Sequence, residues 1–169
     1  MIKRFASLVL SLLLVLSLSA GAQALPEEVS YRSTRRFLEL MDDQKVKYVY
    51  EGLDAEQDEV VRVTYRLEDE NVSFHLCFSQ DGEHCSICAW DLVAFDPADT
   101  DRVLRDVNGL NRQYHSCVFT VDETEATVSA CADVIFRTSG SDEICYEALR
   151  SIARVVNAGL GVLLPYEKE

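Results

Sequence analysis

Six cysteines and three histidines are the residues of this sequence best suited to redox or metal chemistry. Cys85 and Cys88 form a Cys-x-x-Cys pair, the spacing of thioredoxin-like redox centres and of half a zinc site. Such a pair belongs on a tight turn, but this one lies among alternating apolar residues, which predict a strand. Three strand residues span about 10 Å, whereas a disulfide needs Cα atoms about 5.5–6 Å apart. We therefore expect neither a redox centre nor a zinc site, although His75, Cys77, His84, His115 and Cys117 add ligands of the right type.

Disulfides between strands are a second use for the cysteines. Asp81-Gly82 between two alternating runs is typical of a two-residue hairpin turn. This turn would place His75 opposite Cys88 and would make Cys77 and Cys88 diagonal neighbours on the outer face. Cys77–Cys88 is therefore the leading candidate disulfide, although the sequence alone leaves many pairings open.

A second hairpin holds the other candidate pair, Cys117 and Cys131. A two-residue loop at Glu123-Thr124 would pair Phe119 with Val128. Cys117 and Cys131 would then meet only after a slip of one residue, which the hydrophobic register opposes unless a bulge absorbs it. The remaining two cysteines, Cys85 and Cys145, are expected to behave as small apolar core residues.

Catalytic patterns are not found in the sequence. It contains no nucleophile elbow, no glycine-rich phosphate loop and no His-Glu-x-x-His run. We therefore expect a protein that is not an enzyme and that carries no cofactor. Trp90 could serve as a recognition aromatic on a sheet, but the expectation is a core residue, because aromatic side chains mainly supply buried area.

The first 24 residues predict a signal peptide. Lys3 and Arg4 precede an apolar run over residues 8–18, and Ala22-Gln23-Ala24 supplies the small residues of a cleavage site before Leu25. The run is shorter than the roughly 20 apolar residues of a membrane span. We expect cleavage between Ala24 and Leu25, an exported chain of 145 residues from the 169, and no stable membrane anchor afterwards.

The net charge of the chain limits the classes of molecule that it is expected to bind. Loss of Lys3 and Arg4 takes the basic count from 16 to 14 against 29 acidic residues, so the net charge changes from −13 to −15. Nucleic acid is not an expected partner, because its binding depends on Lys and Arg that neutralise phosphates. The acidity favours solubility, and a basic protein partner is the alternative.

Hydrophobic periodicity predicts three helices and six strands in the order α-β-β-β-β-α-β-β-α. After a flexible lead-in at 25–33, with Ser33 or Thr34 as the helix cap, a helix carries Phe37, Leu38 and Met41 at helical spacing. Alternation then predicts strands over 45–52, 61–67, 72–78, 83–95, 115–121 and 126–136, the fourth long enough to contain a bulge. Asp96-Pro97 predicts the start of the middle helix, and a wide apolar face over 144–156 predicts the last helix.

Strands that cluster between helices indicate an α+β fold with a twisted, mostly antiparallel sheet and helices on one face. We expect one domain over residues 34–164, followed by a tail at 165–169.

The stretch DVNGLNRQY (106–114), with Asn108 and Asn111 three residues apart, is followed by the strands VFTVD and 127–132. This pattern resembles the YbjN family of bacterial sensory transduction regulators, and the resemblance covers about residues 34–163. It implies a fold like that of type III secretion chaperones, a dimer in many members, no active site, and a role in regulation or protein interaction. The signal peptide and the six cysteines depart from the family pattern.

Asn108 and Asn111 of this motif are expected to be structural, because asparagine tolerates left-handed backbone and can satisfy exposed carbonyls at a helix end. The function expected from the sequence is an exported, non-catalytic domain that binds an unknown protein or peptide, and that can form a homodimer. The alternative is an exported thiol, disulfide or metal-binding protein.

Overall fold

The computed structural model describes residues 26, 28–67, 70–136 and 140–168. The element order matches the prediction, with two short 3-10 turns added. The elements are α2 (Arg32–Asp43), β1 (Val49–Leu53), β2 (Glu59–Leu67), β3 (Glu70–Phe78), β4 (His84–Ala94), η1 (Pro97–Asp99), α3 (Thr100–Gln113), β5 (Val118–Asp122), β6 (Thr127–Ile135), α4 (Ser141–Leu163) and η2 (Leu164–Tyr166).

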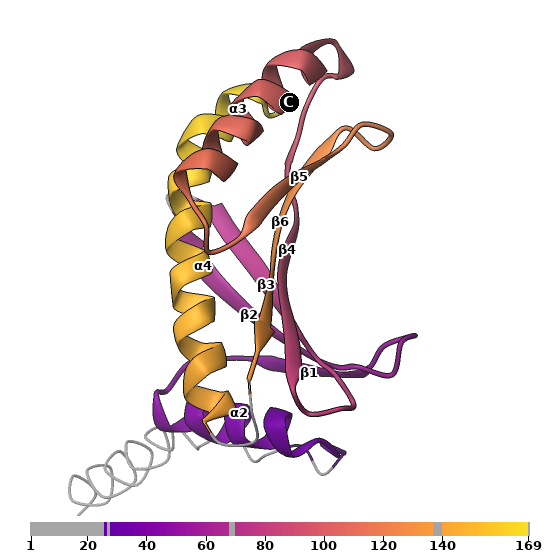
Figure 1. The fold of residues 1–169 in the computed structure, drawn as a ribbon, viewed down its shortest axis with the longest axis vertical. Helices are drawn as coiled ribbons and strands as arrows, with labels where there is room; N and C mark the ends of the chain where they lie inside the picture. The colour runs from indigo at the N-terminus through magenta and orange to yellow at the C-terminus, as the bar shows by residue number, and fades with distance from the viewer. Residues whose placement is uncertain (1–25, 27, 68–69, 137–139, 169) are drawn as a thin grey trace, which may run out of the picture.

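The six strands form one antiparallel sheet in the order β1-β2-β3-β4-β6-β5. The first four strands make the expected meander. The second hairpin then joins through its last strand, so that β6 lies between β4 and β5. Figure 1 shows α3 and α4 on one side of this sheet and α2 beside the start of α4. The α+β prediction, with helices on one face, is confirmed.

The first hairpin has the predicted register but a different turn. His75 lies opposite Cys88, and Cys77 lies opposite Ser86. The loop spans residues 80–83, and only its Gly82 has a positive φ, +70°, so the turn is not the predicted two-residue type. The longer loop is centred on the same point as the predicted one, which is why the register is unchanged.

The second hairpin was predicted in the wrong register. Phe119 lies opposite Ala130 and not Val128, because the loop spans residues 123–126 and ends with Ala126 at φ +54°. The carboxylate of Asp122 holds this loop by accepting from the N–H groups of Thr124 and Glu125 at 2.8 and 3.0 Å. A shift of two residues keeps every side chain on its predicted face.

The predicted irregularity in β4 is present. The pairing of β4 with β6 shifts between Ala89 and Val93, and Asp91 adopts φ +50°. The N–H of Asp91 donates to Oγ of Ser129 at 3.0 Å. This bulge lets the long strand bend while both halves stay paired with β6.

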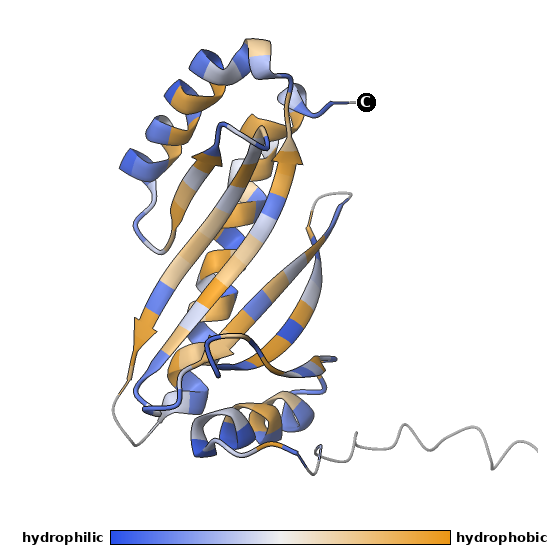
Figure 2. Ribbon diagram, turned by 90° about the vertical axis from the view of Figure 1, so that its right-hand side faces the viewer, coloured by the Kyte–Doolittle hydropathy of each residue, from blue (hydrophilic) through white to orange (hydrophobic). Residues whose placement is uncertain are grey.

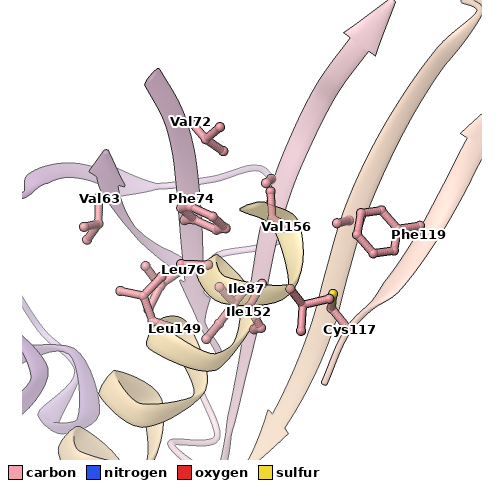
Figure 3. Packing of buried hydrophobic residues seen from close by; sticks show 14 of the residues in the cluster. Val63, Val72, Phe74, Leu76, Ile87, Cys117, Phe119, Leu149, Ile152 and Val156 are labelled. Carbon is pink, nitrogen blue, oxygen red and sulfur yellow. The ribbon is translucent and has the colours of Figure 1, made fainter. Parts of the chain in front are cut away.

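The core lies between the sheet and α4. Figure 2 shows apolar and polar residues alternating along the strands, and Figure 3 shows apolar side chains of the sheet meeting α4. The inward residues of the first hairpin are buried as predicted, as are Cys85 and Cys145. Buried side chains at the contact include Phe74, Leu76, Ile87, Phe119, Leu149, Ile152 and Val156.

The described residues of the predicted lead-in include contacts with β2. Val29 is only 2% exposed, and the N–H groups of Ser30 and Tyr31 donate to the carboxylate of Glu59 at 2.5 and 3.2 Å. The helix begins at Arg32, at least two residues earlier than a cap at Ser33 or Thr34 would allow, and neither residue caps it. The carboxylate of Glu59 on β2 thus holds the two residues that precede the helix, and no side chain caps the first turn.

The predicted tail is also held in place. Glu167 forms a bridge with Phe95, and the N–H of Lys168 donates to the carbonyl of Ala94 at 2.8 Å. The Tyr166 hydroxyl donates to a carboxylate oxygen of Asp106 at 2.7 Å. These contacts join the end of the chain to β4 and α3.

The predicted signal peptide, with its cleavage site at Ala24 and Leu25, lies outside the described residues. Within them, one helical stretch, Ser141–Tyr166, is long and apolar enough to cross a membrane by length and composition alone. The inner face of this stretch packs against the sheet, as expected for the core helix of a folded domain.

Candidate interaction surface on the open face of the sheet

The face of the sheet opposite α4 is not covered by any described helix (Figure 1). We call it the outer face. The register assigns it alternate residues of each strand, several of which have short polar side chains. Its members include Arg62, Thr64, Arg66, Ser73, His75, Cys77, Ser86, Cys88, Trp90, Ser129, Cys131, Asp133, Val118 and Thr120.

Trp90 is the most conspicuous side chain of the outer face. It is 49% exposed, so the expectation of a core tryptophan is wrong. Its ring packs against the imidazole of His75, with centroids 4.7 Å apart and planes at 33°. The predicted register placed Cys88 on the outer face, and strand alternation therefore places Trp90, two residues later, on that face as well. The prediction that Trp90 is buried was based on residue type alone, because aromatic residues in strands are more often buried.

His75 lies near Glu51 of β1 on one side and packs against Trp90 of β4 on the other. Its Nε2 lies 3.9 Å from Oε2 of Glu51, whose other oxygen accepts from Nε of Arg62 at 2.6 Å. Its Nδ1 is buried without a hydrogen-bond partner among the described residues. Burial lowers the pKa of His75, an effect that nearby Glu51 partly opposes. The ring is therefore neutral at pH 7 and packs against Trp90 as a flat, uncharged surface.

A disulfide joins Cys88 to Cys131 on the same face, where Cys88 lies opposite His75. The expected pairing of Cys77 with Cys88 does not form, and neither does a pairing of Cys117 with Cys131. The cause is the position of β6, which lies beside β4 and places Cys131 opposite Cys88. Contacts between strands far apart in the sequence cannot be derived from local hairpin geometry.

The other cysteines are free thiols, and their surroundings do not favour reactivity. Burial raises the pKa of Cys77 to about 11, and the acidic residues near it act in the same direction. Burial likewise raises the pKa of Cys117 to about 11 and that of Cys85 well above its usual range. Since the thiolate is the reactive form, these cysteines are poor nucleophiles at neutral pH.

Metal ligands are also kept apart. Cys85 points into the core, and Cys88 points to the outer face and is bonded to Cys131. Among the residues that the structure describes, no group of three His, Cys, Asp or Glu side chains is placed to hold a metal ion.

The β3–β4 loop and its ends contain the three residue types of a hydrolase triad, namely Ser79, Asp81 and His84. Asp81 lies in the middle: Oδ1 accepts from Oγ of Ser79 at 2.5 Å, and Oδ2 lies 2.6 Å from Nδ1 of His84. In a triad the histidine must lie between serine and aspartate to take the serine proton. Hydrogen bonds from Ser79 and from the Glu83 N–H lower the pKa of Asp81 to about 2. The cluster therefore shapes a turn and does not activate a nucleophile.

The two asparagines of the family motif have different surroundings. Asn111 Nδ2 donates to the Phe119 carbonyl at 2.9 Å, and Asn111 Oδ1 accepts from the Phe119 N–H at 2.8 Å. The side chain thereby pairs with the backbone of β5 and fastens α3 beside that edge of the sheet. Asn108 is exposed. The structural interpretation suits Asn111, but its partner is the next strand and not the helix end.

Glu59 is a residue that sequence reasoning missed. It lies between the predicted strands 45–52 and 61–67, but in the structure it begins β2 and is fully buried. Its carboxylate also accepts from the Tyr50 hydroxyl at 3.1 Å, and burial followed by this carboxylate raises the pKa of Tyr50 to about 12. The available signal was its place in the alternation 59, 61, 63, which points it inward.

Comparison with known proteins supports the fold and the family. A crystal structure of an uncharacterized protein from Methanothermobacter thermautotrophicus matches with a TM-score of 0.56 at 14% identity, over 79% of this chain and 97% of that one. Similarity at this identity concerns the fold alone. Among curated proteins, none matches. The family model YbjN, described as "Putative bacterial sensory transduction regulator", matches residues 35–159. The chain therefore belongs to the YbjN family.

Proposed function

We propose that this protein is an exported, non-catalytic regulatory domain that binds a protein or peptide partner on the outer face of its sheet. The observation that carries the proposal is Trp90, half exposed at the centre of a face that no described helix covers. Tryptophan is enriched among the residues that dominate binding energy at protein interfaces.

The surroundings of Trp90 favour recognition over chemistry. His75 supports one side of the ring, which limits the rotamers that binding must freeze. Serine and threonine side chains nearby, such as the hydrogen-bonded pair Thr64 and Ser73, offer donors and acceptors for a polar rim. Among the described free thiols, all but Cys77 are buried, and the carboxylate of Asp81 holds a turn, which supports a binding role.

Export is proposed on two observations. The N-terminal sequence has the three parts of a signal peptide, and disulfides such as Cys88–Cys131 persist mainly in oxidising compartments. The mass of the protein recovered from its host tests this directly. A chain that begins at Leu25 supports export, and a full-length cytoplasmic chain contradicts it.

Partner binding is tested by site-specific photo-crosslinking in the native cell. A crosslinker at Thr64, which is exposed on the outer face, is compared with one at Arg154, which is exposed on α4. We expect a discrete adduct from position 64 that is lost with Trp90→Ala. Equal capture from both positions, or capture unaffected by Trp90→Ala, would overturn the proposed site.

A further inference from the structure

The sheet has two edges, and they differ in what lies beside them. At the β5 edge, the side-chain amide of Asn111 donates to the Phe119 carbonyl and accepts from the Phe119 N–H. These are the two bonds that a residue of a neighbouring strand would make. At the β1 edge, no strand of the described chain pairs with the side that faces away from β2 (Figure 1). Unpaired N–H and C=O groups of an edge strand are a template for a strand of another chain.

The free edge is formed by residues 47–51, which we call the β1 edge segment. Its exposed side chains are Lys47, Val49 and Glu51, which alternate with less exposed neighbours. Val49 lies opposite Arg62, and Oε1 of Glu51 accepts from Nε of Arg62 at 2.6 Å, so this exposed row lies on the outer face. The segment ends at the bulge of β1, where its pairing with β2 shifts. The bulge limits the length over which another strand can pair here.

The charges of the β1 edge segment complement a second copy of the same segment. Lys47 stands at its start and Glu51 at its end. When two copies pair antiparallel about a two-fold axis through Val49, each Lys47 lies opposite the Glu51 of the other copy. The two Val49 side chains, each 44% exposed in the single chain, then face each other. Opposite-charge pairs stabilise antiparallel strands, and the contact between the valines removes apolar surface from water.

Both charged groups are able to make the new contact. Lys47 has no ion-pair partner among the described residues. Arg62 occupies only Oε1 of Glu51, and the other oxygen, Oε2, lies 3.9 Å from Nε2 of His75. Since each carboxylate oxygen can accept hydrogen bonds, Oε2 can accept from the Lys47 ammonium of another copy.

Other registers lose this complementarity. An axis through Tyr48 would set Val49 opposite Lys47, and an axis through Tyr50 would set Val49 opposite Glu51. Only the axis through Val49 pairs the two opposite charges. The order of charges thus favours a second copy of this chain over an extended peptide of another sequence.

We infer that the β1 edge segment joins two copies of this chain through an antiparallel pairing centred on Val49. The two sheets then form one continuous sheet of twelve strands, six from each copy. Because the two-fold axis is perpendicular to the sheet, both outer faces lie on the same side, and the dimer presents two Trp90 rings on one surface. The inference stands on the edge of the sheet and does not depend on partner binding at Trp90.

Sedimentation velocity of the chain purified from its host tests the dimer, at about 1 to 100 µM protein and about 0.15 M salt. The pairing is short, and a small interface gives weak association, so we expect a dimer fraction that rises over this range. Lys47→Glu sets two carboxylates opposite each other at both ends of the pairing and should raise the dimer dissociation constant at least about tenfold.

Lys168→Glu is the matched control, since it makes the same change of charge at an exposed position outside β1. It should leave the dissociation constant within about twofold, because salt screens distant charges. A chain that stays monomeric throughout the range, or an equal effect of the two variants, overturns the inference.

Disulfide crosslinking tests the register. Both variants are made in a Cys77→Ala chain, which lacks the one described free thiol that is not buried. With Val49→Cys, the two substituted Cα atoms would lie about 4.5–5.5 Å apart across the axis, which is within disulfide range. With Lys47→Cys, the two copies would lie four residues apart along the strand, about 13 Å, which is too far.

After mild oxidation with copper phenanthroline, we expect a band of twice the mass on a non-reducing gel from Val49→Cys and not from Lys47→Cys. Crosslinking of both variants to the same extent, or of neither, overturns the pairing centred on Val49.

Discussion

The side chain of Asn111 is expected to contribute to the stability of the fold, because both of its polar groups form hydrogen bonds. Its two hydrogen bonds to Phe119 pair α3 with the edge of the sheet. We expect Asn111→Ala to lower the free energy of unfolding by about 2 kcal/mol, roughly 1 kcal/mol for each bond. The matched control is Asn108→Ala, three residues earlier and exposed, with an expected change within about 0.5 kcal/mol. Denaturant unfolding measures both, and similar losses would contradict this role of Asn111.

His75 predicts a dependence of stability on pH. Burial lowers its pKa in the folded state below the ordinary value of 6.5, so the unfolded chain binds the proton more readily. The contribution of His75 is complete above pH 6.5 and is lost as the pH falls from 6.5 through the folded-state pKa.

The measurement is the free energy of unfolding of wild type and His75→Gln between pH 7.5 and 5. We expect the wild type to lose more stability over this range than the variant, since glutamine does not titrate. Parallel curves would show that His75 is as easily protonated in the folded state as in the unfolded state.

At the scale of elements, local patterns predicted the helices, the strands and the first hairpin. Alternation decided which side chains face the core, and a loop centred at Asp81-Gly82 decided the register. The predicted register of the second hairpin was wrong because Ala126 adopts a left-handed conformation, which alanine rarely does and which its residue type therefore does not predict. Trp90 was misplaced because residue type was weighed above the alternation that the same strand displayed.

The packing of α4 against β5 depends on a glycine. A Cβ atom at Gly159 would lie 2.6 Å from Cζ of Phe119, so the buried ring would have to shift within a packed core. We expect Gly159→Ala to destabilise the fold by about 1–3 kcal/mol through overpacking. Gly161→Ala meets nothing within 4 Å and should stabilise the helix by up to about 1 kcal/mol. Opposite shifts of the melting temperature check the pair, and a shared sign would contradict the close contact.

At the scale of the whole molecule, the candidate surface depends on a contact that the sequence could not predict. The meander β1–β4 and the unit α3-β5-β6-α4 meet where β4 pairs with β6. The disulfide lies on this seam, between cysteines 43 residues apart. The spacing of cysteines along the chain predicted a Cys77–Cys88 disulfide, because such spacing describes only strands that are close in the sequence. The pairing of β6 with β4 joins strands that are far apart in the sequence.

Loss of this crosslink should be costly. In the chain-entropy view, a loop of this length contributes roughly 3–4 kcal/mol. We expect Cys88→Ala/Cys131→Ala to lose about that much stability, and Cys77→Ala, at a free thiol on the same face, to lose far less. A thiol assay of the unfolded chain should find four free cysteines before reduction, at positions 77, 85, 117 and 145, and all six afterwards. Six before reduction would mean that the crosslink is not formed.

The position of that sulfur bridge also determines whether the fragments stay together after a protease cuts the chain. A single cut in the exposed tip at residues 123–125 separates the polypeptide into two pieces, one carrying Cys88 and the other Cys131. The pieces remain one covalent unit until a reductant reaches them. A nicked molecule would therefore migrate as an intact one on a non-reducing gel and fall into two bands only after thiol treatment.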